Sequence, residues 1–345
     1  PRHSQYIGVL GYGFNEFGDL YSKRQLAVLE AFSDAAIAAS RLVLEQAKIE
    51  LSQSDERSLN NGGLGAIAYA EAIKTYLSFL VSQVANHSTT VCGWNSPNQQ
   101  MRSTFSRQAI SMTWDYAEVN PFSTSSGSFH NLHSRMIKGF ETLGASSQPG
   151  HLVQLDAQNV VYESNMAIST DPPYYDNIPY ADLSDLFYEW LRRSLRENYP
   201  DVFSTLAVPK MEELVADRMR HNGAENAEAF FLAGMSSVFS AMAGQADEGI
   251  PATVYYAFRQ SEIEQEGVSS TGWATFIQAM LDAGYSLVGT WPMRTEKPGR
   301  MRAVGANALA NSVVLVCRKR DANSESVTRA EFIRALKREL PPAIA

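Results

Sequence analysis

The sequence predicts an α/β protein in which a mainly helical region, residues 1–146, precedes an α/β domain, residues 147–345. Three observations support this fold class. Apolar residues of the first part recur at helical spacing, whereas short apolar runs alternate with helical stretches after residue 150. The third observation is composition, because 45% hydrophobic and 19% charged residues in a chain of 345 are typical of a globular protein with a sizeable core.

The first part is expected to be helical because its apolar residues follow one helix face at a time. This spacing fits three ranges, 22–51, 65–85 and 129–143. Two polar loops containing glycine, SQSDERSLNNGG and STSSGS, interrupt the pattern.

The second part alternates expected strands and helices, which is the pattern of a parallel α/β sheet. Strands are expected in the apolar runs 151–157, 165–170, 252–258, 285–291 and 311–317. Helices fit the gaps at 183–195, 209–221, 227–242 and 272–283. Parallel strands bring their carboxyl ends to one edge of a sheet, where α/β proteins bind ligands.

Composition and charge exclude several classes of protein. No window approaches about eighteen uninterrupted apolar residues and the N-terminus lacks a signal-peptide pattern, so we expect a cytoplasmic protein without a membrane partner. Cys92 and Cys317 stand alone, without the spacing of a zinc site or a disulfide framework. The net charge of -8 argues against an overall positive potential, so nucleic-acid binding would need a local basic segment.

A stiff turn follows the strand expected at 165–170. Asp171 stands at the carboxyl end of that strand, and Pro172, Pro173 and Tyr174 follow it. Because prolines fix φ and cannot donate hydrogen bonds, the carbonyl before each is held as an acceptor. The Asp171 carboxylate and the Pro172 carbonyl can each accept one N–H of an exocyclic amino group and turn its lone pair toward an electrophilic methyl group. Tyr174 offers a flat face to an extruded base.

The DPPY motif after an apolar strand resembles the catalytic motif of S-adenosylmethionine-dependent amino methyltransferases that modify DNA, and its Asp form resembles those acting on adenine N6. The chain looks like the C-terminal portion of large prokaryotic adenine-specific DNA methylases over DPPYYDNIPYADLSDLFYEWLRR, FGDLYSKRQL, FSRQAISMTWDYAEVNPF and NALANSVVLVCRKR. The resemblance covers most of the chain. It implies a Rossmann-like class I methyltransferase sheet, S-adenosylmethionine as cofactor, DNA as partner, and a setting in restriction-modification or phage defence.

Further substrate contacts are expected near the turn. Four residues of the same loop precede the next helix: Tyr175, Asp176, Asn177 and Tyr180. A basic segment also follows the strand expected at 285–291, with Glu296 as its one acidic residue and four basic residues: Arg294, Lys297, Arg300 and Arg302. If this strand is parallel to the one ending at Thr170, the segment leaves the sheet at the same edge and can contact DNA phosphates. A solvated surface loop is the alternative.

The cofactor pocket is only partly accounted for. A methyltransferase of this fold needs a Gly-rich turn, and GYGFNEFGD offers only a lone GxG. In the proteins that the chain resembles, that turn lies upstream of the matching portion, so we expect an upstream segment or a separate chain to supply it. The resemblance assigns possible cofactor contacts to seven residues: Gly18, Asp19, Leu20 and Tyr21 at the methionine end, Asp156 and Ala157 at the adenine, and Glu118 at the ribose. Ordinary helix entry is an equal alternative for the first four.

No metal is expected, because His130 and His133 share a helix face without a carboxylate or cysteine partner nearby. Two other functions stay open. The chain could be a non-catalytic DNA-binding or assembly subunit, or it could methylate glutamine in proteins, since similar Asn-containing turns serve that reaction. Asp171 and the basic segment favour DNA.

Overall fold

The computed structural model describes residues 6–51, 55–143, 150–161, 165–176, 178–257, 271–293, 312–321, 324 and 327–344. The chain forms two compact units. Unit 1 comprises Pro1–Gln154 and Asp176–Arg220, and unit 2 comprises Leu155–Tyr175 and His221–Ala345. Residues 176–220, which the sequence pattern grouped with the α/β part, therefore belong to the helical unit 1.

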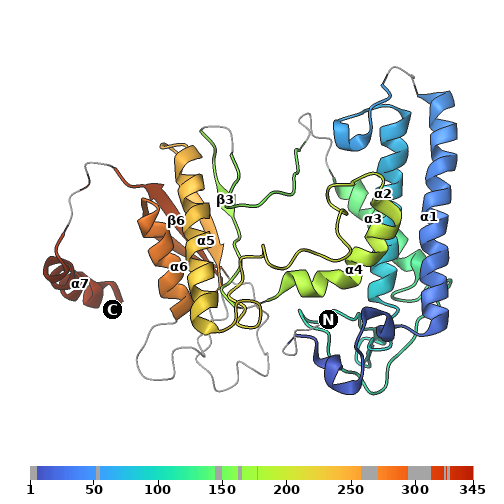
Figure 1. Cartoon of the computed structure of the whole chain (residues 1–345), viewed down its shortest axis with the longest axis horizontal. Coiled ribbons are helices and arrows are strands. Elements are labelled where there is room, and N and C mark those ends of the chain that lie inside the picture. Colours follow the sequence, from blue (N-terminus) through green and yellow to red (C-terminus); the bar gives the residue numbers. More distant parts are fainter. Residues whose placement is uncertain are drawn as a thin grey trace. The chain divides into compact units, whose positions relative to one another are not determined.

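Unit 1 is built on four helices, α1 (Lys23–Glu50), α2 (Ala66–Asn86), α3 (Phe129–Thr142) and α4 (Tyr180–Leu195), shown in Figure 1. The helices predicted at 22–51, 65–85, 129–143 and 183–195 are confirmed within three residues at each end. Short 3-10 turns at Gly8–Tyr12, Phe17–Leu20 and Leu59–Asn61 and a two-stranded ladder of β1 (Trp94–Asn95) and β2 (Gln100–Met101) complete the unit.

Helix α1 has a local cap, and helix α4 packs in the core of unit 1. Ser22 caps α1, because its side chain accepts the Gln25 N–H while the Gln25 side chain accepts the Ser22 N–H, a capping box. The apolar stripe of α4 is core, since Leu183, Leu186 and Trp190 are buried in one cluster with residues of α1 and α2.

The helix predicted at 209–221 is wrong. These residues are irregular, and Lys210 and Arg220 bind Asp185 and Asp182 of α4. Arg220 also binds Glu213. The Asp217 carboxylate accepts the backbone N–H of Met219, a local bond that competes with helix formation. Tertiary ion pairs have therefore overridden an acceptable local helix propensity.

Unit 2 contains a four-stranded sheet with helices α5 (Ala224–Gln245), α6 (Thr271–Asp282) and α7 (Arg329–Ile344). The strands are β3 (Ser169–Thr170), β4 (Ala252–Tyr256), β5 (Tyr285–Met293) and β6 (Ser312–Lys319), in the order β3-β4-β6-β5. Strands β3 and β4 are parallel, whereas β6 is antiparallel to both β4 and β5. The sheet is therefore mixed, and the expectation of a wholly parallel sheet is wrong, because an apolar strand pattern does not encode strand direction.

One expected strand is absent, and one helix was not expected. Residues 150–161 form no strand, and Leu152 and Leu155 are 95% and 63% exposed, because no described strand lies beside them to accept a ladder. Helix α7 was not predicted from the sequence. Helix α5 is long and apolar enough to cross a membrane by length and composition alone, a property shared by core helices, and its Phe231 and Phe239 are fully buried in the protein.

Candidate functional site

The carboxyl ends of three strands lie at one edge of the sheet in unit 2. Strand β5 is antiparallel to β6, which is antiparallel to β4, so β5 runs in the same direction as β4 and β3. Thr170, Tyr256 and Met293, the last residues of these strands, therefore mark the same edge. Asp171 follows Thr170 directly, which is the position where α/β sheets place ligand-binding loops.

Asp171 is exposed at this edge and is held by its own turn. The Tyr174 hydroxyl donates a hydrogen bond to Asp171 Oδ1 at 2.7 Å, and the two prolines between them are half-buried. A hydroxyl bound to the carboxylate limits its rotation, and a bond to an ionised acceptor is stronger than a neutral one. The turn therefore presents a carboxylate of defined orientation to solvent.

Tyr174 is fixed from the other side by the core. Its ring meets the ring of Tyr256, the last residue of β4, edge to face at 5.3 Å. Tyr256 is 2% exposed and stacks on Phe276 of α6 at 4.1 Å. An edge-to-face contact of this kind is a favoured aromatic geometry. The sheet core thus positions the tyrosine that in turn positions Asp171.

Tyr175 has an unusual backbone, with φ at 53°. A non-glycine residue in this left-handed region costs about 1 kcal/mol or more and persists only where surrounding contacts hold it. Here its ring packs edge to face on Phe231 of α5 at 5.2 Å, and Phe231 is fully buried. With this left-handed backbone at Tyr175, the consecutive rings of Tyr174 and Tyr175 contact two different core aromatics, Tyr256 and Phe231.

Only two of the other expected substrate residues lie among the residues that the structure describes. Asp176 and Tyr180 belong to unit 1, where Asp176 is half-buried and Tyr180 is exposed, while Asn177 lies outside the described residues. The basic residues Arg294, Lys297, Arg300 and Arg302 also lie outside them. The basic segment was expected beside Asp171 only if the strand before it runs parallel to the strand that ends at Thr170. Strand β5 does run parallel to β3, and it ends at Met293 on the edge that carries Asp171.

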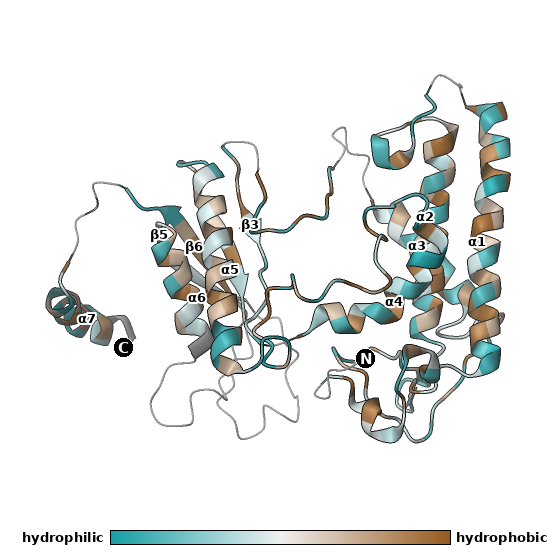
Figure 2. Cartoon of the chain, viewed as in Figure 1, coloured by the Kyte–Doolittle hydropathy of each residue, from teal (hydrophilic) through white to brown (hydrophobic). Residues whose placement is uncertain are grey.

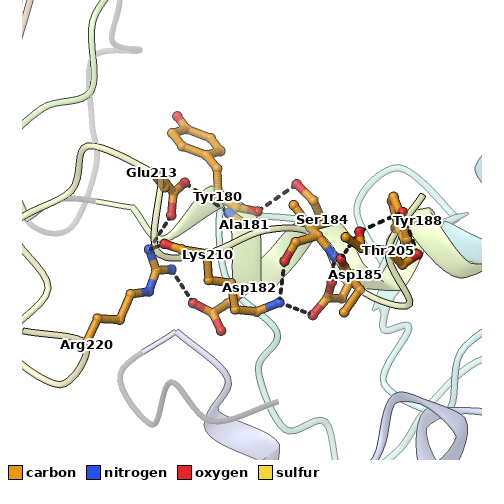
Figure 3. A network of polar contacts seen from close by, with 12 residues as sticks. Tyr180, Ala181, Asp182, Ser184, Asp185, Tyr188, Thr205, Lys210, Glu213 and Arg220 are labelled. Atoms are coloured by element: carbon orange, nitrogen blue, oxygen red, sulfur yellow. Dashed lines mark hydrogen bonds and ion pairs between the residues drawn. The ribbon is translucent and has the colours of Figure 1, made fainter. Parts of the chain in front are cut away.

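A buried ion network that the sequence did not reveal anchors α4, the helix after the DPPY loop (Figure 3). Arg220 donates to Asp182 at 2.5 Å and to Glu213 at 2.7 Å, and its Nε lies 3.3 Å from Asp217. Asp182 lies in the first turn of α4 but does not cap the helix. Instead, Glu213 accepts the Ala181 N–H at 2.9 Å, so a distant residue caps the helix while Asp182 binds Arg220.

Arg220, the positively charged centre of the network, is almost completely buried. The Arg220 side chain is 9% exposed, as is that of Asp182. Burial by itself would lower the pKa of Arg220, but its hydrogen bonds to Asp182 and Glu213 and their charges raise the pKa overall. A second pair, Lys210 with Asp185 at 2.7 Å, continues the network along α4. These pairs hold residues 205–220 of unit 1 against the helix (Figure 3).

The expected adenine contact of the cofactor, Asp156, does not end a strand. It opens an exposed turn in which its carboxylate accepts the Gln158 backbone N–H at 3.0 Å and the Asn159 side-chain amide at 2.7 Å. Ala157, the next residue, is exposed in the same turn. The carboxylate is therefore engaged locally.

The residues expected at the methionine end are engaged in unit 1. Asp19 accepts the backbone N–H groups of Asn15 and Glu16, while Leu20 and Tyr21 are buried in the core. Burial raises the pKa of the Tyr21 phenol well above its usual range. A Cβ built on Gly18 would meet nothing within 4 Å, so the described chain does not require glycine there for a close backbone approach.

Glu118, the expected ribose acid, forms a two-pronged ion pair with Arg24, which lowers the pKa of that carboxyl. Taken unit by unit, the acidic candidates for S-adenosylmethionine, Asp156, Asp19 and Glu118, therefore already have partners within the chain. Among the described residues, no group of three or more His, Cys, Asp and Glu could hold a metal ion.

Comparison of the chain with protein-family models, with curated proteins and with solved structures gives no match. The chemistry of the DPPY turn therefore remains as the basis for inferring a function.

Proposed function

We propose that this chain carries the target-amino site of an adenine-N6 DNA methyltransferase. The observation that carries the proposal is the Asp171–Tyr174 turn at the carboxyl edge of a sheet, with its carboxylate exposed, hydrogen-bonded by Tyr174 and braced by the core through Tyr256. An amino group conjugated to a purine ring is a poor nucleophile, and a fixed pair of acceptors corrects this by orientation.

In this proposal Asp171 accepts one N–H of adenine N6 and the Pro172 carbonyl accepts the other. Tyr174 contacts the extruded base while its hydroxyl keeps the Asp171 carboxylate in place. Tyr175 holds the turn through its contact with Phe231. Pro172 and Pro173 reduce the conformational freedom of the turn, so less entropy is lost when substrate binds.

The strand directions of unit 2 support the same reading. Strands β3, β4 and β5 run in one direction, so their carboxyl ends meet at the edge that carries Asp171, which is where α/β sheets bind ligands. This is an analogy of fold, and it adds to the chemistry of the turn without replacing it.

S-adenosylmethionine would supply the methyl group, and a further polypeptide segment with a Gly-rich turn would complete its pocket. That segment is either an upstream part of a longer chain or a separate subunit. The basic segment from Arg294 to Arg302 would contact phosphates beside the turn, in a complex that weakens with salt.

A second candidate function is a non-catalytic DNA-binding or assembly subunit. The observation that favours it is that Asp156, Asp19 and Glu118, the acidic cofactor candidates, each have partners within the chain. A subunit of this kind would keep the DPPY turn and bind DNA without binding cofactor.

Calorimetric titration of the purified chain with S-adenosylmethionine, followed by a methylation assay, separates the two candidates. Unmodified genomic DNA of mixed sequence serves as substrate, and N6-methyladenine is measured by mass spectrometry. We expect Asp171→Ala to lower the rate about 100-fold or more, because it removes a group that acts in the transition state. Asp201→Ala, which changes an exposed aspartate of unit 1, is the control and should leave the rate unchanged.

Full activity in Asp171→Ala would refute the proposed role of the turn. Absence of cofactor binding by a chain with a cooperative unfolding transition would mean that another segment supplies the cofactor pocket. DNA binding without methylation even when that segment is present would favour the second candidate. Micromolar cofactor binding that weakens in Asp156→Ala would instead show that Asp156 contributes to a pocket within this chain.

A further inference from the structure

The sheet of unit 2 has one face covered by helices and one open face. Residues alternate between the faces along each strand. Tyr256 faces the covered side, where it stacks on Phe276 of α6, and the register places Val254 and Leu315 on the same side. Val254 and Leu315 are almost fully buried. Helices α5 and α6 thus cover this face (Figure 1).

The open face is apolar although no described helix covers it. The register places on it a set of neighbouring residues from three strands: Thr253, Tyr255, Val314, Val316, Trp291 and Met293. Trp291 is 68% exposed and Met293 is 45% exposed, whereas Val314 is 8% exposed and Thr253, Tyr255 and Val316 are half-buried. A contiguous apolar patch that includes a tryptophan usually marks a surface that another element covers.

Helix α7 carries a matching apolar stripe. Phe332, Leu336 and Leu340 recur every four residues with Ile333 beside them, so they share one helix face. Phe332 is 57% exposed, and the other three also remain accessible to solvent. Arg334, Lys337 and Arg338 fall on the remaining surface. Figure 2 shows both apolar and polar colours along α7, which is the pattern of a helix that packs on one side only.

The lengths of the elements and of their connection suit each other. The 16 residues of α7 extend about 24 Å, and the 8 residues of β6 extend about 26 Å. Residues 320–328 join the end of β6 to the start of α7 and could span up to about 30 Å. The helix can therefore turn back and lie antiparallel along β6, with its middle near Val316.

We propose that α7 docks on the open face of the sheet of its own chain, with Phe332, Leu336 and Leu340 against Trp291 and Val316. A tether of this length keeps the helix at an effective concentration in the millimolar range, so an intrachain partner is favoured over a free one. The docked helix turns Arg334, Lys337 and Arg338 to solvent. This proposal goes beyond the methyl-transfer site and does not depend on it.

A cysteine cross-link tests the docking. In the full chain we would combine Val316→Cys with Leu336→Cys and follow disulfide formation by non-reducing electrophoresis and peptide mapping. Native Cys92 and Cys317 are both fully buried and should not react. We expect an intrachain disulfide that forms at the same rate at every protein concentration. The control, Val316→Cys with Arg334→Cys on the opposite side of α7, should cross-link at least 10-fold more slowly.

Equal rates in the two pairs, or cross-links found only between chains, would overturn the proposal, and the second result would assign the open face to another copy. A measurement without new cysteines covers the case in which the double variant does not fold. The difference in acrylamide quenching between the chain and Trp291→Phe isolates Trp291. This quenching should increase at least two-fold in Leu336→Asp with Leu340→Asp and stay constant in Lys337→Asp; no increase in the first variant would also overturn the proposal.

Discussion

At the scale of single residues, Tyr175 shows how side-chain packing can hold a backbone in an unfavourable state. Its φ of 53° is strained for a residue with a Cβ, and the ring contact with buried Phe231 compensates. The same strained residue follows Tyr174 directly and so fixes the direction in which the chain leaves the DPPY turn. Sequence could show the tyrosine but not the sign of its φ.

Two substitutions at Tyr175 separate the strain from the contact. Both Tyr175→Ala and Tyr175→Gly remove the ring, but only glycine adopts positive φ without cost. We therefore expect Tyr175→Gly to unfold with a free energy about 1 kcal/mol higher than Tyr175→Ala, as measured by urea denaturation. An alanine variant at least as stable as the glycine variant would mean that the left-handed backbone carries no strain.

Cys317 illustrates a burial effect on titration. Burial raises the pKa of its thiol to about 12 from an ordinary value near 9, and burial together with Cys317 raises the pKa of Tyr285 to about 12. Because the folded state holds the Cys317 proton more tightly, its contribution to stability is complete below pH 9 and is lost as the pH rises from 9 to 12.

The free energy of unfolding should therefore fall between pH 9 and 11, and it should fall less steeply in Cys317→Ala than in the unchanged chain. Urea denaturation at intervals of half a pH unit measures both slopes. A lower stability of Cys317→Ala at pH 8 is expected from its lost packing and does not affect the comparison. Parallel slopes in the two proteins would contradict the assignment to this thiol.

At the scale of elements, the apolar face of α4 can be predicted from local sequence, but the residues that cap it and pair with its charges cannot. Its apolar stripe is local information, since Leu183, Leu186 and Trp190 lie on one face at helical spacing. Its cap and its ion partners come from Glu213 and Arg220, about thirty to forty residues later in the chain. Such long-range charge pairing cannot be read from spacing, because any of many acidic residues could have met Arg220.

Substitution of Arg220 should show how much the buried ion network contributes to the free energy of unfolding. Arg220→Met would leave the carboxylates of Asp182, Glu213 and Asp217 close together without their cation, and we expect a loss of about 3–5 kcal/mol. The matched control is Arg193→Met, which breaks the exposed pair with Asp34 and should cost less than about 1 kcal/mol. Equal losses in the two variants would show that burial does not strengthen the network.

At the scale of the whole molecule, the chain passes between its two compact units more than once, so neither unit is a continuous piece of sequence. The sequence boundary near residue 147 follows a real change of pattern, from helices to strands. Even so, α4 packs in the core of unit 1, with Leu29, Val81 and Val84 of the earlier helices. Residues from the later half of the chain therefore form part of the hydrophobic core of unit 1.

In a fragment of residues 147–345, α4 should for this reason be exposed to proteolysis. Without α1 and α2, the buried faces of Leu186 and Trp190 would be exposed, so we expect residues 176–220 to be cleaved rapidly by a low concentration of protease, with the sites mapped by mass spectrometry. The full chain is the control and should resist cleavage in that range. Equal resistance of the fragment would mean that α4 does not depend on the earlier helices.

What the sequence determined by itself is local: the helices α1 to α6 apart from exact ends, the apolar stripe of α4, the three longer strands, and the DPPY turn with Asp171 after a strand. These depend on periodicity, caps and proline, which act over a few neighbouring residues. Only the tertiary structure decided the antiparallel direction of β6, the loss of the strand at 151–157, the irregular course of 209–221, and the bond from Tyr174 to Asp171. Each of these depends on which distant segment lies alongside, and hydrophobic spacing carries no record of that choice.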